Sequence, residues 1–288
     1  MPRFVDMGLV PEEKIPALGE VIAGIIRLRS SILPWIAIAT MILVWVLVPQ
    51  TGHRLEELDW AIDHDELGFG GWWYLCVSRP IFQVFLFGWL WRIVILAALL
   101  KRILRLGLKI VAPHPDRLGG LGFIEGFPTI FAPLAFACSC VLASKWAHEV
   151  TWHGVHVQSF RMQAVIYIAL SLVLCISPLL VFIPFLRKQK RKAVAEYSQL
   201  IARHGRLVHQ QWMEGRPVSD RTILEAPELG PTCDIGAIFE AVKSMRIIPF
   251  TRKSLLAIAI PAGLPLLAVF LMEIPIGELI GKILKALL

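Results

Sequence analysis

Arg92 lies inside an apolar run, which makes it a candidate for a functional role. Eight residues separate Arg92 from Lys101 at the end of that run, which places the guanidinium roughly 12 Å deeper on a regular helix. Arg79 and Gln83 belong to the same run, and we expect Arg79 and Arg92 on one side of it with Gln83 on another. All three are candidates for a pore lining or a lipid contact. The structural alternative is an arginine that extends to the lipid phosphates.

Histidines and a carboxylate form a second candidate group. Glu149, His153 and His156 are spaced i, i+4, i+7 and would share one face of a continuous helix, which is a ligand spacing typical of zinc or copper. Gly154 lies between the two histidines and could interrupt that helix. The alternative is a polar turn between two spans, and beyond zinc or copper the sequence suggests no cofactor.

A glycine-rich loop at residues 113–123 is the third candidate. Its glycines allow close backbone approach to a phosphate, as a nucleotide or a lipid headgroup would need. The loop lacks the Lys-Ser/Thr ending of a Walker motif, so we favour a tight structural turn capped by its aspartate. The candidate residues here are His114, Asp116, Arg117, Gly119 and Gly120.

The composition identifies the class of protein that must position these residues. Of the 288 residues, 56% are hydrophobic and 18% are charged, and the apolar ones gather in long runs. A helix needs about 20 apolar residues to cross a bilayer, whereas the strands of a membrane barrel are about 10 residues long. The net charge of +7 arises from cations beside these runs, so nucleic acid is not an expected partner.

We therefore expect an all-α integral membrane protein with four to five spans and interfacial amphipathic helices. An N-terminal interfacial segment precedes the spans, a cytoplasmic helical segment follows them, and the chain ends in a last apolar span or re-entrant hairpin plus an amphipathic tail. The expected boundaries are 1–31 for the first segment, 32–48, 74–100, 127–147 and 163–186 for the spans, 187–253 for the cytoplasmic segment and 254–288 for the end.

Within the cytoplasmic segment, an apolar stripe repeats at alternating spacings of three and four. Val194, Tyr197, Ile201 and His204 belong to it, and a short helix at 235–245 or a neighbouring subunit would cover it. The cations decide the orientation: five lie in 101–126, five in 187–192 and one in the acidic loop 49–71. The positive-inside rule then places the N-terminus in the cytoplasm.

Two motifs resemble a family of uncharacterised bacterial multi-pass inner-membrane proteins. They are Pro-His-Pro-Asp-Arg-Leu-Gly-Gly-Leu-Gly-Phe at 113–123 and Ser-Met-Arg-Ile-Ile-Pro-Phe at 244–250, the second before a proline-containing apolar segment. The resemblance covers about residues 75–288. It implies the bacterial cytoplasmic membrane and a helical fold of four to five spans, and it supplies no activity or catalytic residue.

Three functions remain open from the sequence. The first is a non-enzymatic homo-oligomer in the bilayer that forms an ion-conducting pore, with the stripe holding subunits together, because four spans are few to enclose a pore alone. The second is a membrane anchor or scaffold for a soluble cytoplasmic protein. The third, a membrane-bound metal- or lipid-dependent enzyme, has only the histidines in its support.

Overall fold

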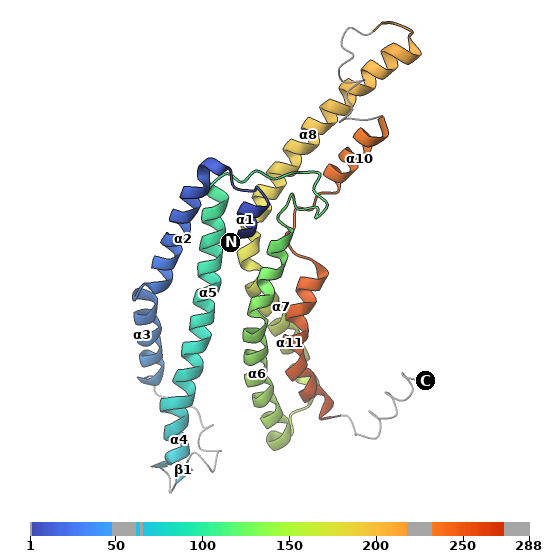
Figure 1. The fold of residues 1–288 in the computed structure, drawn as a ribbon. Helices are drawn as coiled ribbons and strands as arrows, with labels where there is room; N and C mark the ends of the chain where they lie inside the picture. The colour runs from blue at the N-terminus through green and yellow to red at the C-terminus, as the bar shows by residue number, and fades with distance from the viewer. Residues whose placement is uncertain (1, 48–61, 64–65, 218–231, 274–288) are drawn as a thin grey trace. The chain divides into compact units, whose positions relative to one another are not determined.

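The computed structural model describes residues 2–47, 62–63, 66–217 and 232–273 (Figure 1). It is a helical protein, and within those ranges five helical segments are long and apolar enough to cross a membrane. This confirms the expected all-α class, and the five candidate segments agree with the upper number of expected spans. The segments are Glu12–Val44, Phe69–Arg105, Gly122–His153, Val157–Met213 and Arg252–Leu271.

The contacts divide the chain into two units, one of Glu20–Leu99 and one that joins Met1–Gly19 to Leu100–Leu288. The first unit contains most of α2 (Ile15–Ser30), α3 (Leu33–Leu47), the antiparallel pair β1 (Ile62–Asp63) and β2 (Glu66–Leu67), α4 (Phe69–Trp73), the π-turn η2 (Tyr74–Ser78) and α5 (Arg79–Arg105) up to Leu99. Trp72 and Trp73 before α5 are exposed, as an interfacial aromatic belt requires. Most of the acidic loop 49–71 lies outside the described residues.

The second unit begins with α1 (Pro2–Asp6) and η1 (Glu12–Lys14), which pack on the loop after α5. The Phe4 ring meets Phe123 edge to face at 4.8 Å, and Lys14 donates to the backbone oxygen of Leu106. The remaining elements are η3 (Gly122–Phe131), α6 (Ala132–His153), η4 (Val157–Phe160), α7 (Arg161–Leu180), α8 (Phe182–Val208), η5 (His209–Met213), α10 (Thr232–Lys243) and α11 (Arg252–Leu271).

Helix α11 packs against both α6 and α7 and forms a three-helix bundle with them. It is a continuous helix through Pro261 and Pro265, so the re-entrant hairpin expected as an alternative does not form in residues 252–271. A buried cluster from the three helices includes Trp146 stacked on Phe160, with ring centroids 5.0 Å apart. The amphipathic tail that the sequence predicts beyond residue 273 lies outside the described residues.

Two hydrogen bonds join helices of the bundle. Apolar packing alone would not select one arrangement of these helices. The fully buried Ser139 on α6 donates to the backbone oxygen of Ala262 on α11 at 2.6 Å. The Tyr167 hydroxyl on α7 donates to the Ala135 oxygen on α6 at 2.5 Å. Because lipid tails are as apolar as the helix faces, such bonds help to select one arrangement of the helices.

Helices α8 and α10 form a hairpin that runs beyond the ends of α6 and α11 (Figure 1). Helix α8 follows α7 after Val181 alone, so the fourth span continues as a polar helix, as its sequence predicts. The chain's own α10 packs against α8, and His204 of the stripe is 4% exposed. The helix at 232–243 therefore covers part of the stripe, which is the first of the two expected alternatives.

Replacing Ser139 tests the bundle. Ser139→Ala should lower the free energy of unfolding by about 0.6–1.7 kcal/mol, since it leaves the Ala262 oxygen without this donor. Unfolding by denaturing detergent in mixed micelles measures the change. Ser144→Ala is the control, because Ser144 lies on the same helix and is exposed. Equal destabilisation by both variants would contradict the role of this bond.

Candidate functional site

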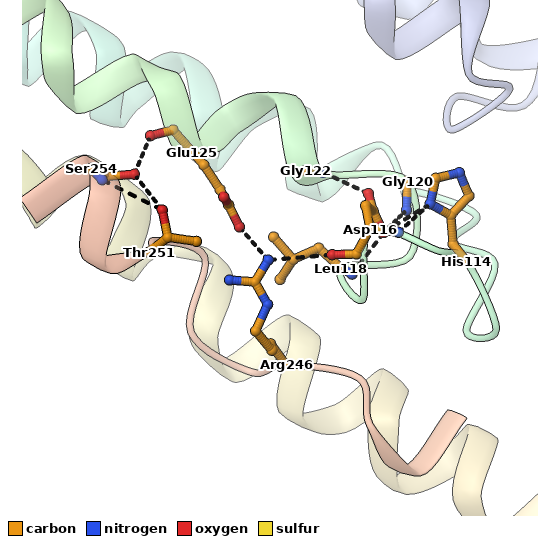
Figure 2. A network of polar contacts seen from close by, with 9 residues as sticks. All are labelled: His114, Asp116, Leu118, Gly120, Gly122, Glu125, Arg246, Thr251 and Ser254. Carbon is orange, nitrogen blue, oxygen red and sulfur yellow. Dashed lines mark hydrogen bonds and ion pairs between the residues drawn. The ribbon is translucent and has the colours of Figure 1, made fainter. Parts of the chain in front are cut away.

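Two segments far apart in the chain meet at one end of the helical bundle (Figure 2). We call residues 113–123 the Asp116 loop and residues 244–250 the Arg246 segment. The backbone N–H of Arg246 donates to the Arg117 oxygen at 2.7 Å, and its guanidinium reaches the Asp116 backbone oxygen at 3.3 Å. The motifs at 113–123 and 244–250 thus form one site, although about 130 residues of chain separate them.

The Asp116 carboxylate organises its loop from the inside. Its Oδ1 accepts the backbone N–H groups of Leu118 at 2.7 Å and Gly120 at 3.2 Å, and its Oδ2 accepts that of Gly122 at 2.7 Å. The His114 Nδ1 lies 2.8 Å from Oδ1. The loop is therefore an anion-binding concavity of backbone N–H groups whose anion is its own side chain.

Glycine is required at this loop for conformation and for space. Gly119 and Gly120 have φ values of 69° and 95°, which side chains rarely adopt. A Cβ on Gly119 would lie 2.9 Å from the Ile110 Cβ, and one on Gly122 would lie 2.9 Å from the Asp116 Cβ. These glycines let the backbone wrap closely around the carboxylate, which supports the tight-turn interpretation. The N–H groups that a bound phosphate would need are already engaged.

A second carboxylate connects the loop to α11. The Arg246 guanidinium pairs with Glu125 on η3 at 2.5 Å, where both side chains are largely buried. The Ser254 hydroxyl donates to the Glu125 backbone oxygen at 2.9 Å, and its own N–H reaches the N-capping hydroxyl of Thr251. From α8, the Lys190 ammonium donates to the Met245 oxygen at 2.6 Å. The junction therefore ties η3, α8 and α11 together.

Opposing effects determine the pKa of Asp116. Burial raises it, but the backbone N–H donors of Leu118, Gly122 and Gly120 and the His114 ring lower it by more, so the pKa lies below its ordinary 3.8. A lowered folded-state pKa means that the ionised carboxylate stabilises the fold above the unfolded-state pKa. That contribution is lost as the pH falls through the folded value.

Arg117 differs from the other loop residues because its side chain points to solvent. It is exposed, and it is the one non-glycine residue with positive φ, at 58°, among the residues that the structure describes. That conformation costs a residue with a Cβ of order 1 kcal/mol. Its backbone oxygen is fixed by Arg246, so the loop presents the guanidinium from a rigid position.

The candidates on the second span do not form the expected face. Helix α5 is regular from Arg79 to Arg105, and thirteen residues at about 100° each rotate Arg92 about 220° from Arg79. The expectation that these arginines share a side is therefore wrong. Gln83, one turn after Arg79, shares the Arg79 side instead. The exposed Arg92 guanidinium lies 4.7 Å from the centre of the Trp89 ring.

The expected metal face also fails to form. Helix α6 ends at His153, and Gly154 follows it in the left-handed conformation with φ 62°. His156 therefore leaves the helix face of Glu149 and His153, and its Nδ1 instead lies 3.6 Å from Glu273, just after α11. In the described ranges, no group of three His, Cys, Asp or Glu side chains is placed to hold a metal ion.

The sequence predicted Asp116 as a cap of the loop, but it did not predict the ion pair between Glu125 and Arg246 in the same site. Glu125 lies at the apolar start of the third span segment, and Arg246 lies in the motif at 244–250. A carboxylate and a guanidinium at these two positions could have suggested that the two segments form an ion pair. No family model matches the chain, and neither the curated proteins nor the solved structures contain a match. The junction itself therefore carries the functional argument.

Asp116→Asn tests the internal anion. The amide keeps the size but not the charge, so the free energy of unfolding at pH 7 should fall by about 2 kcal/mol, the order of a charge-assisted hydrogen bond. The variant should also lose less stability than the original chain as the pH falls from 5 towards 3, roughly the range over which an aspartate titrates. Melting temperatures across that range measure both effects.

Asp6→Asn, on an exposed aspartate, is the control for the loss of one negative charge. An unchanged acid dependence in Asp116→Asn would show that the carboxylate does not stabilise the loop.

Proposed function

We propose that this chain is a non-enzymatic membrane anchor whose α8–α10 hairpin docks a soluble cytoplasmic protein. The observation that carries the proposal is the hairpin itself. Helix α8 extends the fourth span as a polar helix of 27 residues, α10 packs against it, and the junction ties both to the bundle. A helix pair held rigidly to membrane spans is suited to present a surface to another protein.

The hairpin carries two features of a protein-binding surface. Trp212 and Met213 at the end of η5 are 75% and 77% exposed, and both residue types are enriched in protein interfaces. Closer to the bundle, α8 and α10 leave a groove of about 410 Å³. The groove is lined by Pro113, Glu196, Tyr197, Leu200, Ile235 and Ile238.

The attachment to the junction makes the hairpin a rigid platform. Lys190 on α8 binds the Met245 oxygen just after α10, and the neighbouring Arg246 binds the Asp116 loop. Both helices of the hairpin are thus held at the end near the bundle. Because the hairpin is already ordered at this end, binding of a partner would cost little conformational entropy there.

The location in the bacterial cytoplasmic membrane is part of this proposal. It rests on the family resemblance, and the orientation rests on the cations beside the spans. Exposed cations of the second unit gather at the end that carries the hairpin, and under the positive-inside rule they support a cytoplasmic position for that end and for the N-terminus. They are Lys101, Arg102, Arg105, Lys109, Arg117, Arg187, Lys188, Arg191 and Lys192.

The double variant Trp212→Ser/Met213→Ser tests the docking surface. Cells that express the tagged chain at its native level are cross-linked, and the chain is purified in mild detergent. The original chain should retain one soluble protein in a fixed stoichiometry, and the double variant should retain at least about tenfold less, because buried aromatic anchors dominate interface energies.

Trp152→Ser is the matched control, since Trp152 is 76% exposed but lies near the end of α6 away from the hairpin. All variants should melt at the temperature of the original chain. A complex that survives the double variant, or the lack of any stoichiometric complex, would contradict the anchor function.

An ion pathway through a homo-oligomer is the second candidate function, and Arg92 favours it. The residue is exposed in the middle of α5, thirteen residues from each helix end, where a cation is costly in lipid. A water-filled path between subunits would remove that cost. The ring of Trp89 beneath the guanidinium offsets part of it.

Flux from liposomes that contain the purified chain tests this second candidate. Anion conductance should be present in the original chain, and Arg92→Gln should lower the ratio of anion to cation permeability severalfold, because one cation per subunit leaves the path. Arg161→Gln, on an exposed cation at the start of α7, is the control. The absence of conductance at any voltage or pH would eliminate the pathway.

A further inference from the structure

We propose that the surface around Arg117 binds the phosphate of an anionic phospholipid. The surface consists of Arg117 on the Asp116 loop and of Arg252 and Lys253 on the first turn of α11, and all three side chains are exposed. Contacts of the junction link these positions: Arg246 binds the Arg117 oxygen and pairs with Glu125, whose backbone oxygen accepts the Ser254 hydroxyl beside Lys253.

The charge balance at the junction leaves these cations uncompensated. Its carboxylates are engaged internally, Asp116 by backbone N–H groups and Glu125 by Arg246. In the part of the chain that the structure describes, Arg117, Arg252 and Lys253 have no carboxylate within ion-pair distance. The surface therefore has a net positive charge that an external anion can neutralise.

The conformation of Arg117 indicates that its side chain is retained for a contact outside the chain. The backbone at this position has φ 58°, which glycine adopts without cost, and the loop uses glycine at the next two positions of positive φ. Arginine at 117 adds strain, and the hydrogen bond within its own loop, from its N–H to the His114 oxygen, is a backbone bond that glycine would make as well. An anion bound by the guanidinium would supply the compensating energy.

The start of α11 shows a second local cost of the same kind. Cations are unfavourable in the first turn of a helix, where the unpaired N–H groups already give a partial positive charge. Arg252 and Lys253 both occupy that turn directly after the N-cap Thr251. Lipid phosphate bound at this surface would offset both costs, the strain at Arg117 and the unfavourable cations in the first turn of α11.

The position in the fold identifies the anion as a lipid headgroup. The Asp116 loop leads into η3 and α6, and Arg252 and Lys253 begin α11, so the cations lie where two apolar helices leave the hydrocarbon layer. Lipid phosphates are concentrated at that depth, and cations close to an anionic leaflet each add about fivefold to its attraction. We therefore assign the surface to a phospholipid with net negative charge.

Binding of phosphatidylglycerol, compared with phosphatidylcholine of the same acyl chains, tests the proposal on the full chain in detergent. Native mass spectrometry counts the bound lipids, and the melting temperature reports the stabilisation. Phosphatidylglycerol should bind more tightly than phosphatidylcholine. Arg117→Gly should weaken its binding about fivefold, the contribution of one cation, and Arg252→Gln/Lys253→Gln should weaken it further.

Arg117→Gly also separates binding from folding. Because glycine relieves the strain at φ 58°, this variant should melt at or above the temperature of the original chain in phosphatidylcholine, and it should lose the additional stabilisation by phosphatidylglycerol. Arg161→Gln, at the other end of the bundle, should bind phosphatidylglycerol like the original chain.

Four outcomes would overturn the proposal. The first is equal binding of both lipids by the original chain, and the second is unchanged phosphatidylglycerol binding in Arg117→Gly. The third is a loss of phosphatidylglycerol binding in Arg161→Gln as large as that in Arg117→Gly. The fourth is full displacement of the lipid by millimolar inorganic phosphate, which would indicate a site for a free anion. None of these readouts depends on the partner of the α8–α10 hairpin, so the lipid site and the anchor function stand or fall separately.

Discussion

The carboxylate of Asp116, surrounded by backbone N–H groups of its own loop, is the interaction on which the described junction depends. It fixes the path of residues 116–122, and that path positions the two backbone oxygens that Arg246 binds. Arg246 in turn neutralises Glu125. The ionised carboxylate is held in place by three backbone N–H donors. Moving it would leave these donors unpaired, which costs more free energy than each hydrogen bond contributes in isolation.

The junction joins two parts of the chain that follow different physical rules. In the bundle of α6, α7 and α11, lipid competes equally for apolar faces, so the Ser139 and Tyr167 hydrogen bonds and close packing select the arrangement. In the α8–α10 hairpin, water drives Ile235 and Val242 into burial. Lys190 and Arg246 connect these parts with charge-assisted bonds to backbone oxygens.

Particular residues show how far a sequence of this kind can be interpreted. The apolar runs predicted α5, α6, α7 and α11 because length and hydropathy alone decide whether a helix can cross a bilayer. Asp116 was predicted as a cap because its chemistry is local. Glu125 was not predicted, because its partner Arg246 lies 121 residues away, and His156 was assigned to a face that Gly154 interrupts.

The sequence by itself determined the helical membrane class, the approximate spans and the polar extension of α8, since each depends on periodicity and on transfer of side chains from water to lipid. Only the tertiary structure decided that the glycine-rich loop encloses its own carboxylate, that α10 covers part of the stripe on α8, and that Arg117 is left exposed in a strained conformation. These features depend on which distant segments meet, and spacing along one chain contains no information about that.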